Sequence, residues 1–246
     1  MAGIRRRGID RFHQATTRFA KSRGPRTIGR TMNAPERLVY TGNDEADRLL
    51  ARDPLALLIG FTLDQQVPLQ KAFIGPYELQ RRLGAPLDAA RIGGMDPGEL
   101  ASVFAERPAL HRFPGAMAAR VQALCAAVAS SFGGDAARVW LEAADGPDLR
   151  SRLLGLPGIG EMKAGTIAAV LARRFGLELP GIETVLPDHP TLGDVDSPDA
   201  LAAYQAGKRA HKAALQAGQH EGDAGRAAIG AADRLTARTG SRPRSG

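Results

Sequence analysis

This sequence contains one cysteine, one tryptophan and no long apolar run, and aromatic residues make up only 5% of its 246 positions. The single cysteine excludes an internal disulfide framework, a zinc finger with cysteine ligands and a four-cysteine iron–sulfur cluster. No apolar run approaches the ~20 residues of a membrane-spanning helix, so we expect no membrane partner. We expect no metal site either, because the histidines beyond the N-terminus lack the spacing of metal ligands: His111, His189, His211 and His220.

Positive charge is concentrated at the N-terminus. Residues 1–31 hold nine Lys or Arg and one acid, whereas residues 32–246 hold 24 basic and 25 acidic residues. The net charge of +7 therefore belongs to a basic arm, which we expect to be disordered. Three interpretations of the arm stay open: a tail that binds phosphates, a targeting peptide, and an over-extended gene start with Met32 as the true first residue. Its lack of an apolar segment argues against an export signal.

The body, residues 32–215, is expected to be one all-α domain followed by a flexible tail at 216–246. Asp53-Pro54 and Asp96-Pro97 are typical helix starts, in which Asp caps the helix and Pro occupies the first turn. No stretch shows the sustained alternation of a strand. The segment 54–63 is apolar almost all round, so we expect a central, buried helix there. Further helices are predicted at 68–83, 97–106, 114–132, 136–144, 147–154 and from 161 onward. A last helix is expected to start after Asp196, with Asp196 as its N-cap.

Apolar residues recur at helical spacings of three and four after Pro114. Cys125 falls within this stripe, so we expect a buried structural thiol rather than a reactive one. The stripe consists of Met117, Val121, Leu124, Cys125, Val128 and Phe132.

A tight turn is predicted at Leu156-Pro157-Gly158-Ile159-Gly160, between two helices. Gly158 and Gly160 permit a sharp bend and the close approach of a phosphate, while Ile159 anchors the turn in the core. Backbone amides at the start of the second helix would favour an anion. Lys163 lies in the first turn and could reach the same phosphate. The turn thus predicts a grip on a nucleic-acid backbone without sequence readout, although a purely structural turn and a solvated Lys163 remain open alternatives.

The segment 156–164 resembles the helix-hairpin-helix motif. The upstream run Leu58-Ile-Gly-Phe-Thr-Leu-Asp-Gln-Gln66 resembles the glutamine-bearing helix end of the HhH-GPD superfamily of base-excision DNA glycosylases. The segments at 64–68 and 113–118 are similar to those of a mainly actinobacterial HhH-GPD family. The resemblance implies a helix-hairpin-helix glycosylase-like bundle that acts as a monomer on double-stranded DNA in the bacterial cytoplasm, at the nucleoid. Gln65 and Gln66 would then enter the duplex near an extruded base; alternatively they only hydrogen-bond a helix end.

The chemistry that the resemblance implies is hydrolysis of the N-glycosidic bond of a flipped base. A carboxylate near C1′ stabilises positive charge on the sugar and helps to activate water. Superfamily members carry an aspartate shortly after the second hairpin helix, where register places Glu183 here. Asp194 and Glu183 are joint leading candidates, Asp188 is a third, and the alternative is that all three are solvated loop acids.

Bifunctional relatives carry a Schiff-base lysine where this sequence has Met162. Lys163 is one step along, about 100° around the helix, and is expected to face elsewhere. The resemblance therefore implies a monofunctional glycosylase with water as the nucleophile. It implies no iron–sulfur cluster or other cofactor, apart from a monovalent cation at the hairpin.

Two other functions stay open. One is a duplex-binding protein that has kept the hairpin but lost the catalytic acid. The other is an assembly protein that uses the helical scaffold without DNA. The sequence does not name the base lesion.

Overall fold

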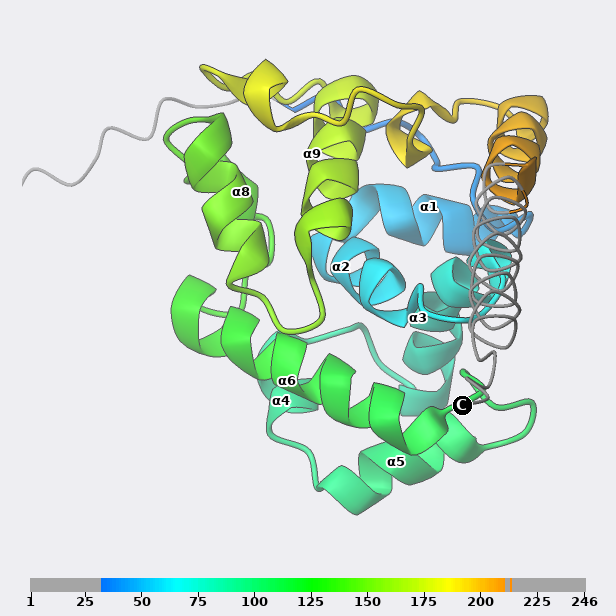
Figure 1. Cartoon of the computed structure of the whole chain (residues 1–246). Helices are drawn as coiled ribbons and strands as arrows, with labels where there is room; N and C mark the ends of the chain where they lie inside the picture. The colour runs from blue at the N-terminus through cyan, green and yellow to red at the C-terminus, as the bar shows by residue number, and fades with distance from the viewer. Residues whose placement is uncertain (1–31, 211–212, 214–246) are drawn as a thin grey trace, which may run out of the picture.

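Residues 32–210 and 213 are described by a computed structural model, and every regular element within them is a helix (Figure 1). The all-α prediction is therefore confirmed for this part of the chain. The segments 1–31 and 216–246, with His211 and His220, lie outside the described residues. The labelled helices are α1 (Asp44–Arg52), α2 (Pro54–Leu63), α3 (Leu69–Leu83), α4 (Ala89–Gly93), α5 (Pro97–Ala105), α6 (Pro114–Phe132), α7 (Arg138–Leu141), α8 (Gly146–Leu154) and α9 (Glu161–Phe175). Two 3-10 turns follow, η1 (Ile182–Val185) and η2 (Leu192–Asp194), and a further helix starts at residue 198.

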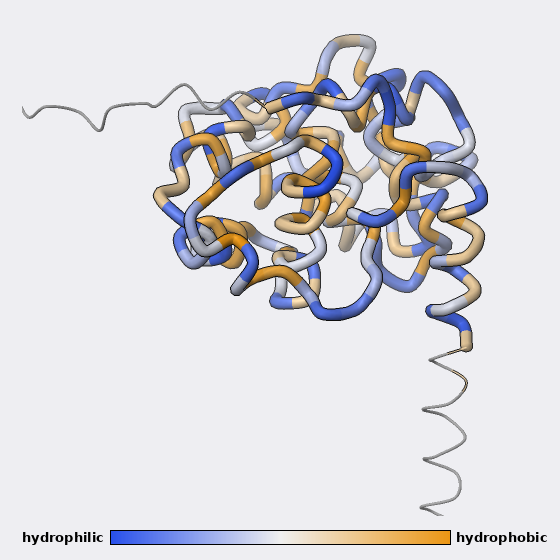
Figure 2. Tube along the Cα trace, turned by 90° about the horizontal axis from the view of Figure 1, so that it is seen from above, coloured by the Kyte–Doolittle hydropathy of each residue, from blue (hydrophilic) through white to orange (hydrophobic). Residues whose placement is uncertain are grey.

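Helix α2 occupies the centre of the molecule, as its composition predicts. Every residue from Leu55 to Leu63 is buried, and α2 packs against α1, α3 and α6. The Asp53 carboxylate accepts hydrogen bonds from the amides of Leu55 and Ala56, which confirms the predicted cap. A helix without a polar face is stable in water only when other elements cover it on all sides. In Figure 2 the apolar stretches run through the body and many of the hydrophilic ones lie at its outline.

Helices α2 and α3 approach closely at glycines. A Cβ on Gly60 would lie 2.8 Å from the Phe73 ring, and one on Gly75 would lie 2.4 Å from Leu63. The Phe73 ring packs edge-on against those of Phe61 and Tyr40, with centroids 5.0 and 5.3 Å away. These three aromatic rings therefore supply a large contact area between the central helix and its neighbours.

Helix α6 forms a layer with α4 and α5. Its predicted stripe is buried from Met117 to Val128, while Phe132 at the end is only partly buried. Burial raises the pKa of the Cys125 thiol to about 12, which fits the expected structural role. α6 is the one helix among the described residues with the length and hydropathy of a membrane span. Its buried stripe packs against α4 and α5, and a single helix of this kind does not indicate a membrane protein.

Helices α8 and α9 run side by side and are joined by a short turn (Figure 1). The segment after α9 folds back over both of them: η1 packs against the start of α8, and η2 packs against α9. A Cβ on Gly193 would lie 2.6 Å from the backbone of Ala169, so only glycine allows this approach. The chain also returns to this region at its other end, where the Asn33 amide donates to the Phe175 carbonyl.

Most predicted helix boundaries hold to within one or two residues, with three differences. The helix expected at 136–144 is a single turn, α7, and helices α1 and α4 were not predicted. Asn43 and Asp88 cap these two helices, so a local signal was present for both. The predicted Asp196 cap is wrong: the Ser197 hydroxyl accepts the Ala200 amide instead, and Asp196 is exposed.

Candidate functional site

The turn between α8 and α9 has the geometry that its two glycines predict. The Ile159 amide donates to the Leu156 carbonyl at 3.1 Å, and Gly158 has φ +86°. Pro157 followed by a residue with positive φ is the sequence of a type II turn. Ile159 is 5% exposed, so it anchors the turn in the core as expected.

Gly160 leaves the start of α9 open. Nothing lies within 4 Å of the position that a Gly160 Cβ would occupy, and its backbone is extended. The first helical hydrogen bond runs from the Ala164 amide to the Gly160 carbonyl, and no side chain caps this end. The amides of residues 161–163 therefore point out of the helix without a partner in it, at its positive end.

The turn after α2 is held from three sides. The Gln65 side chain donates to the Thr62 carbonyl at 2.9 Å and accepts a hydrogen bond from Arg120 of α6. The Gln65 carbonyl accepts from the Nε2 of His111 at 2.9 Å. Gln66, by contrast, is exposed and has φ +55°, a left-handed conformation uncommon for residues other than glycine. Of the two predicted glutamines, Gln65 is engaged within the fold and Gln66 is free to contact a ligand.

One hollow brings the two predicted motifs together. It has a volume of about 650 Å³, and we call it the hairpin hollow. Direct contact of α2 with the turn explains the arrangement, because a Cβ on Gly158 would lie 3.2 Å from the Thr62 Cγ2. The hollow is lined by Gln65, Arg120, Gly158, Gly160, Glu161, Met162 and Lys163.

Met162 and Lys163 both border this hollow. Met162 is 82% exposed and points into solvent, whereas the Lys163 ammonium folds back to donate to the Gly158 carbonyl at 3.2 Å. The two side chains therefore take different directions, as expected for neighbouring residues of a helix, although both border the hollow. Side chains in the first turn of a helix lean toward its N-terminus, which carries the long lysine stem over the turn. Burial lowers the pKa of Lys163, and the positive charge of Arg120 adds to this effect.

The monovalent cation that the resemblance implies at the hairpin stays a prediction. Such an ion would need backbone carbonyl oxygens, and the Gly158 carbonyl already accepts a hydrogen bond from the chain's own Lys163 ammonium. No group of three or more His, Cys, Asp or Glu that could hold a metal occurs within the described part of the chain.

Asp194 serves the local structure of the segment after α9. Both of its carboxylate oxygens contact Arg173 at 2.5 Å, and one also accepts from the amide and hydroxyl of Thr191. These bonds form a capping box around η2. Arg173 lies about 18 Å further along α9 than Glu161, by the rise of an α-helix. Asp194 therefore does not border the hairpin hollow.

Glu183 and Asp188 are exposed. Glu183 belongs to η1, which packs against the start of α8, at the opposite end of that helix from the turn. Asp188 lies in the loop between η1 and η2. Neither residue lines the hairpin hollow. The hollow therefore joins the hairpin to Gln65 of the turn after α2, but none of the three predicted acids lines it.

A different acid, Asp64, lies beside the hollow. It directly precedes Gln65 and interacts electrostatically with Lys163 and with Lys208 of the C-terminal helix. Burial raises the pKa of Asp64, and the positive charges of Lys208 and Lys163 act against this rise. Tyr204 packs under the Lys208 ammonium, 5.4 Å from its ring centre, and feels the charges of both Asp64 and Asp194.

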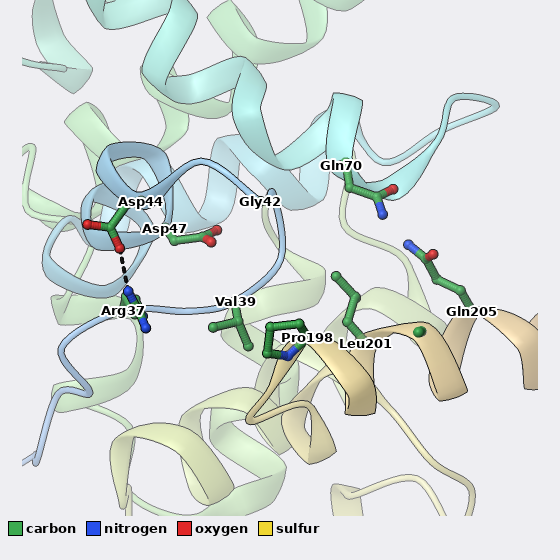
Figure 3. Close-up of a pocket in the computed structure, with 10 residues that line it drawn as sticks. Arg37, Val39, Gly42, Asp44, Asp47, Gln70, Pro198, Leu201 and Gln205 are labelled. Carbon is green, nitrogen blue, oxygen red and sulfur yellow. Dashed lines mark hydrogen bonds and ion pairs between the residues drawn. The ribbon is translucent and has the colours of Figure 1, made fainter.

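A second pocket, of about 360 Å³, lies away from the hairpin (Figure 3). It lies between residues 37–47 on one side and the C-terminal helix, which starts at residue 198, on the other. Its charged groups already have partners: Arg37 pairs with Asp44, and the Asp47 carboxylate accepts from the backbone of Tyr40 and Thr41. These contacts fasten residues 38–42 onto α1, and we assign this pocket no ligand.

Comparison of the chain with family models, curated proteins and solved structures finds no match. The assignment of function therefore depends on the geometry of the hairpin hollow. Three of the residues around it were given no role by sequence analysis: Arg120, His111 and Asp64. These residues act on the turn after α2 or on Lys163, and most of these interactions join residues that are distant in sequence. Only Asp64 had a signal in the sequence, because it is part of the Asp-Gln-Gln run at 64–66.

Proposed function

We propose that this chain binds duplex DNA through the α8–α9 turn and hydrolyses the N-glycosidic bond of a flipped, damaged or mispaired base. The observation that carries the proposal is the hairpin hollow, in which the turn meets Gln65, Arg120 and Lys163. Open amides at the start of α9 suit one phosphate, and the two cations suit its neighbours. In a bacterial cell the protein would act in the cytoplasm, at the nucleoid.

The proposed grip is independent of sequence. Backbone amides and single cations contact phosphates, which fix position on the duplex but carry no base information. Gln66, exposed at the tip of the turn after α2, is the side chain placed to contact the bases beside an extruded nucleotide. A base must leave the stack before the bond to its sugar can be attacked.

A monofunctional mechanism fits the residues at the turn. Met162 cannot form a Schiff base, and Lys163 donates to the Gly158 carbonyl. Water is then the nucleophile, and the product is an abasic strand that breaks only after alkali treatment. Strand cleavage without alkali would instead indicate lyase activity.

A base-release assay tests the enzymatic part of the proposal. Duplexes that carry one uracil, one alkylated base or one oxidised base are incubated with the full chain, and free base is measured. Release from at least one duplex, with no release from the undamaged duplex, is the expected result. Failure on every duplex would contradict the enzymatic function.

Salt-dependent binding tests the grip separately. We expect Lys163→Met and Arg120→Met each to weaken duplex binding and to reduce the slope of log K against log salt by about 0.9, the value for one phosphate contact. Arg48→Met is the matched control, because Arg48 lies on α1 and does not line the hollow. Unchanged slopes in both variants would contradict the proposed grip.

A second candidate is a duplex-binding protein without catalysis. The commitment of Asp194 to Arg173 and Thr191 favours it, since that carboxylate is already satisfied within the fold. The two candidates differ in outcome: this one predicts salt-sensitive binding with no release of any base.

A further inference from the structure

The acid at the C-terminal end of α2 differs from the acids that cap the N-termini of helices. The carboxylates of Asp53, Asp88, Asp96 and Asp145 each accept a hydrogen bond from a helix amide. Within the described residues, no hydrogen bond to the carboxylate of Asp64 is recorded, although this residue is partly buried. A partly buried acid with no structural hydrogen bond loses hydration without compensation, which is typical of functional sites.

Two lysines from different helices act electrostatically on this acid. Lys163 comes from the first turn of α9 and Lys208 from the C-terminal helix. The whole chain contains only five lysines, against 28 arginines, so their convergence on one carboxylate is not explained by abundance. Positive charge from both lysines opposes the effect of burial on the Asp64 pKa and favours the ionised carboxylate, the form that can accept a proton.

Asp64 is also placed where a DNA strand held by the hairpin would pass. The next residue, Gln65, lines the hairpin hollow, and so does Lys163. Two residues earlier, Thr62 packs against Gly158 of the turn. The one acid that lines the hollow itself, Glu161, is paired with Arg150 at 2.6 Å.

We propose that Asp64 is the carboxylate that acts on the deoxyribose, with Lys163 and Lys208 as positioning residues. This inference rests on the proposed glycosylase function. The electron pair of the C1′–N bond leaves with the base, and the Asp64 carboxylate stabilises the positive charge on the sugar. Water adds to C1′ and passes one proton to Asp64, and that proton reaches the departing base nitrogen through solvent. The products are the free base and an abasic site.

Single-turnover base release from the duplex that the wild type processes best tests Asp64. We expect Asp64→Asn to slow release by about 100-fold or more, the typical loss when a charge-stabilising group is removed. Duplex affinity should hold or increase, because the variant removes a negative charge from the binding face. Asp64→Glu should recover part of the rate. The matched control is Asp199→Asn, which makes the same chemical change at an exposed residue on the C-terminal helix.

The pH profile of base release tests the role of Lys208 as a positioning residue. The titratable groups that interact with Asp64 are Lys163, Lys208 and Tyr204. Lys208→Gln removes one of the two charges that oppose the burial effect, so the acidic limb of the profile should move to higher pH. A residue with a purely structural role would lower the rate without moving this limb.

The outcomes separate the inference from the proposed function. A wild-type chain that releases no base overturns both. An active wild type whose Asp64→Asn variant releases base within threefold of its rate overturns the Asp64 inference alone. So does an Asp64→Asn variant whose loss of release is matched by an equal loss of duplex binding or by a lower melting temperature. Loss of release in Glu183→Gln or Asp194→Asn, with Asp64→Asn active, would assign the carboxylate to the segment after α9.

Discussion

The turn after α2 and the segment after α9 both carry acids near the hairpin helices, but they use them differently. In the segment after α9, Asp194 is held by Arg173 and Thr191, and the backbone packs tightly on α9. In the turn after α2, Gln65 holds the chain through Thr62, Arg120 and His111. The side chains of Asp64 and Gln66 make no hydrogen bond within the described part of the chain. The difference between the two segments lies in the side-chain hydrogen bonds. An acid that the fold leaves without a hydrogen-bond partner is a better candidate for a functional role than one whose oxygens are already bonded.

The largest expected effect tests how tightly the segment after α9 is packed. Gly193→Ala places a Cβ 2.6 Å from the backbone of Ala169, which cannot rotate away. We expect a loss of about 1–3 kcal/mol in the free energy of unfolding, measured by urea denaturation. The control is Gly207→Ala, where open space surrounds the new Cβ and a small gain is expected. Equal stability of both variants would mean that η2 does not pack on α9 as described.

The two glycines of the turn should separate stability from binding. Gly158→Ala forces a Cβ onto φ +86° and against Thr62, so it should cost about 1 kcal/mol of stability. Gly160→Ala meets open space and should leave the melting temperature unchanged, but it should weaken duplex binding because the Cβ occupies the approach to the open amides. Thermal melting and fluorescence anisotropy of a labelled duplex measure the two quantities. Identical behaviour of the two variants would remove the distinction.

The structural role of Asp194 predicts a loss of stability smaller than that of Gly193→Ala. Asp194→Asn removes the pair with Arg173 and weakens the cap on η2, and we expect a loss of about 1 kcal/mol in unfolding free energy. A double-mutant cycle with Arg173→Met isolates the ion pair, which should contribute only a few tenths of a kcal/mol at this exposure. Strict additivity of the two substitutions would show that the pair adds nothing.

The smallest effect concerns the histidine under the glutamine turn. Burial lowers the pKa of His111, and its Nδ1 accepts the Phe113 amide, so the folded state favours the neutral ring. The resulting stability is fully present above the unfolded pKa of about 6.5 and is lost as the pH falls below it toward the lower folded value. Melting temperatures between pH 7.5 and 5 should therefore fall more steeply for the wild type than for His111→Gln. Parallel curves would contradict a role for this ring.

Much of the helical framework could be predicted because its signals are local. Asp53 and Asp96 cap helices through bonds that span two or three residues, and Pro in the first turn reinforces them. The stripe around Cys125 and the anchor at Ile159 were also predicted, since apolar periodicity directly reflects burial. Helix α1 was missed although Asn43 and an acid-rich first turn marked its start.

The candidate site could be predicted only in part. The sequence indicated both the turn at 156–160 and the glutamines, and the structure places them in one hollow. Register along the chain pointed to Glu183, with Asp194 as a joint candidate, but position along the chain does not reveal hydrogen-bonding partners. The engagement of Gln65 by Arg120, 55 residues away, likewise has no local signal.

Taken alone, the sequence determined where helices start and stop, which faces are buried, and that two glycines bend the chain before α9, because these depend on bonds and clashes between near neighbours. Tertiary structure decided which side chains remain available. Arg173 takes up Asp194, Arg120 and His111 hold Gln65, and the lysines of two separate helices converge on Asp64. Such choices depend on which helices pack together, and packing joins residues that the sequence keeps far apart.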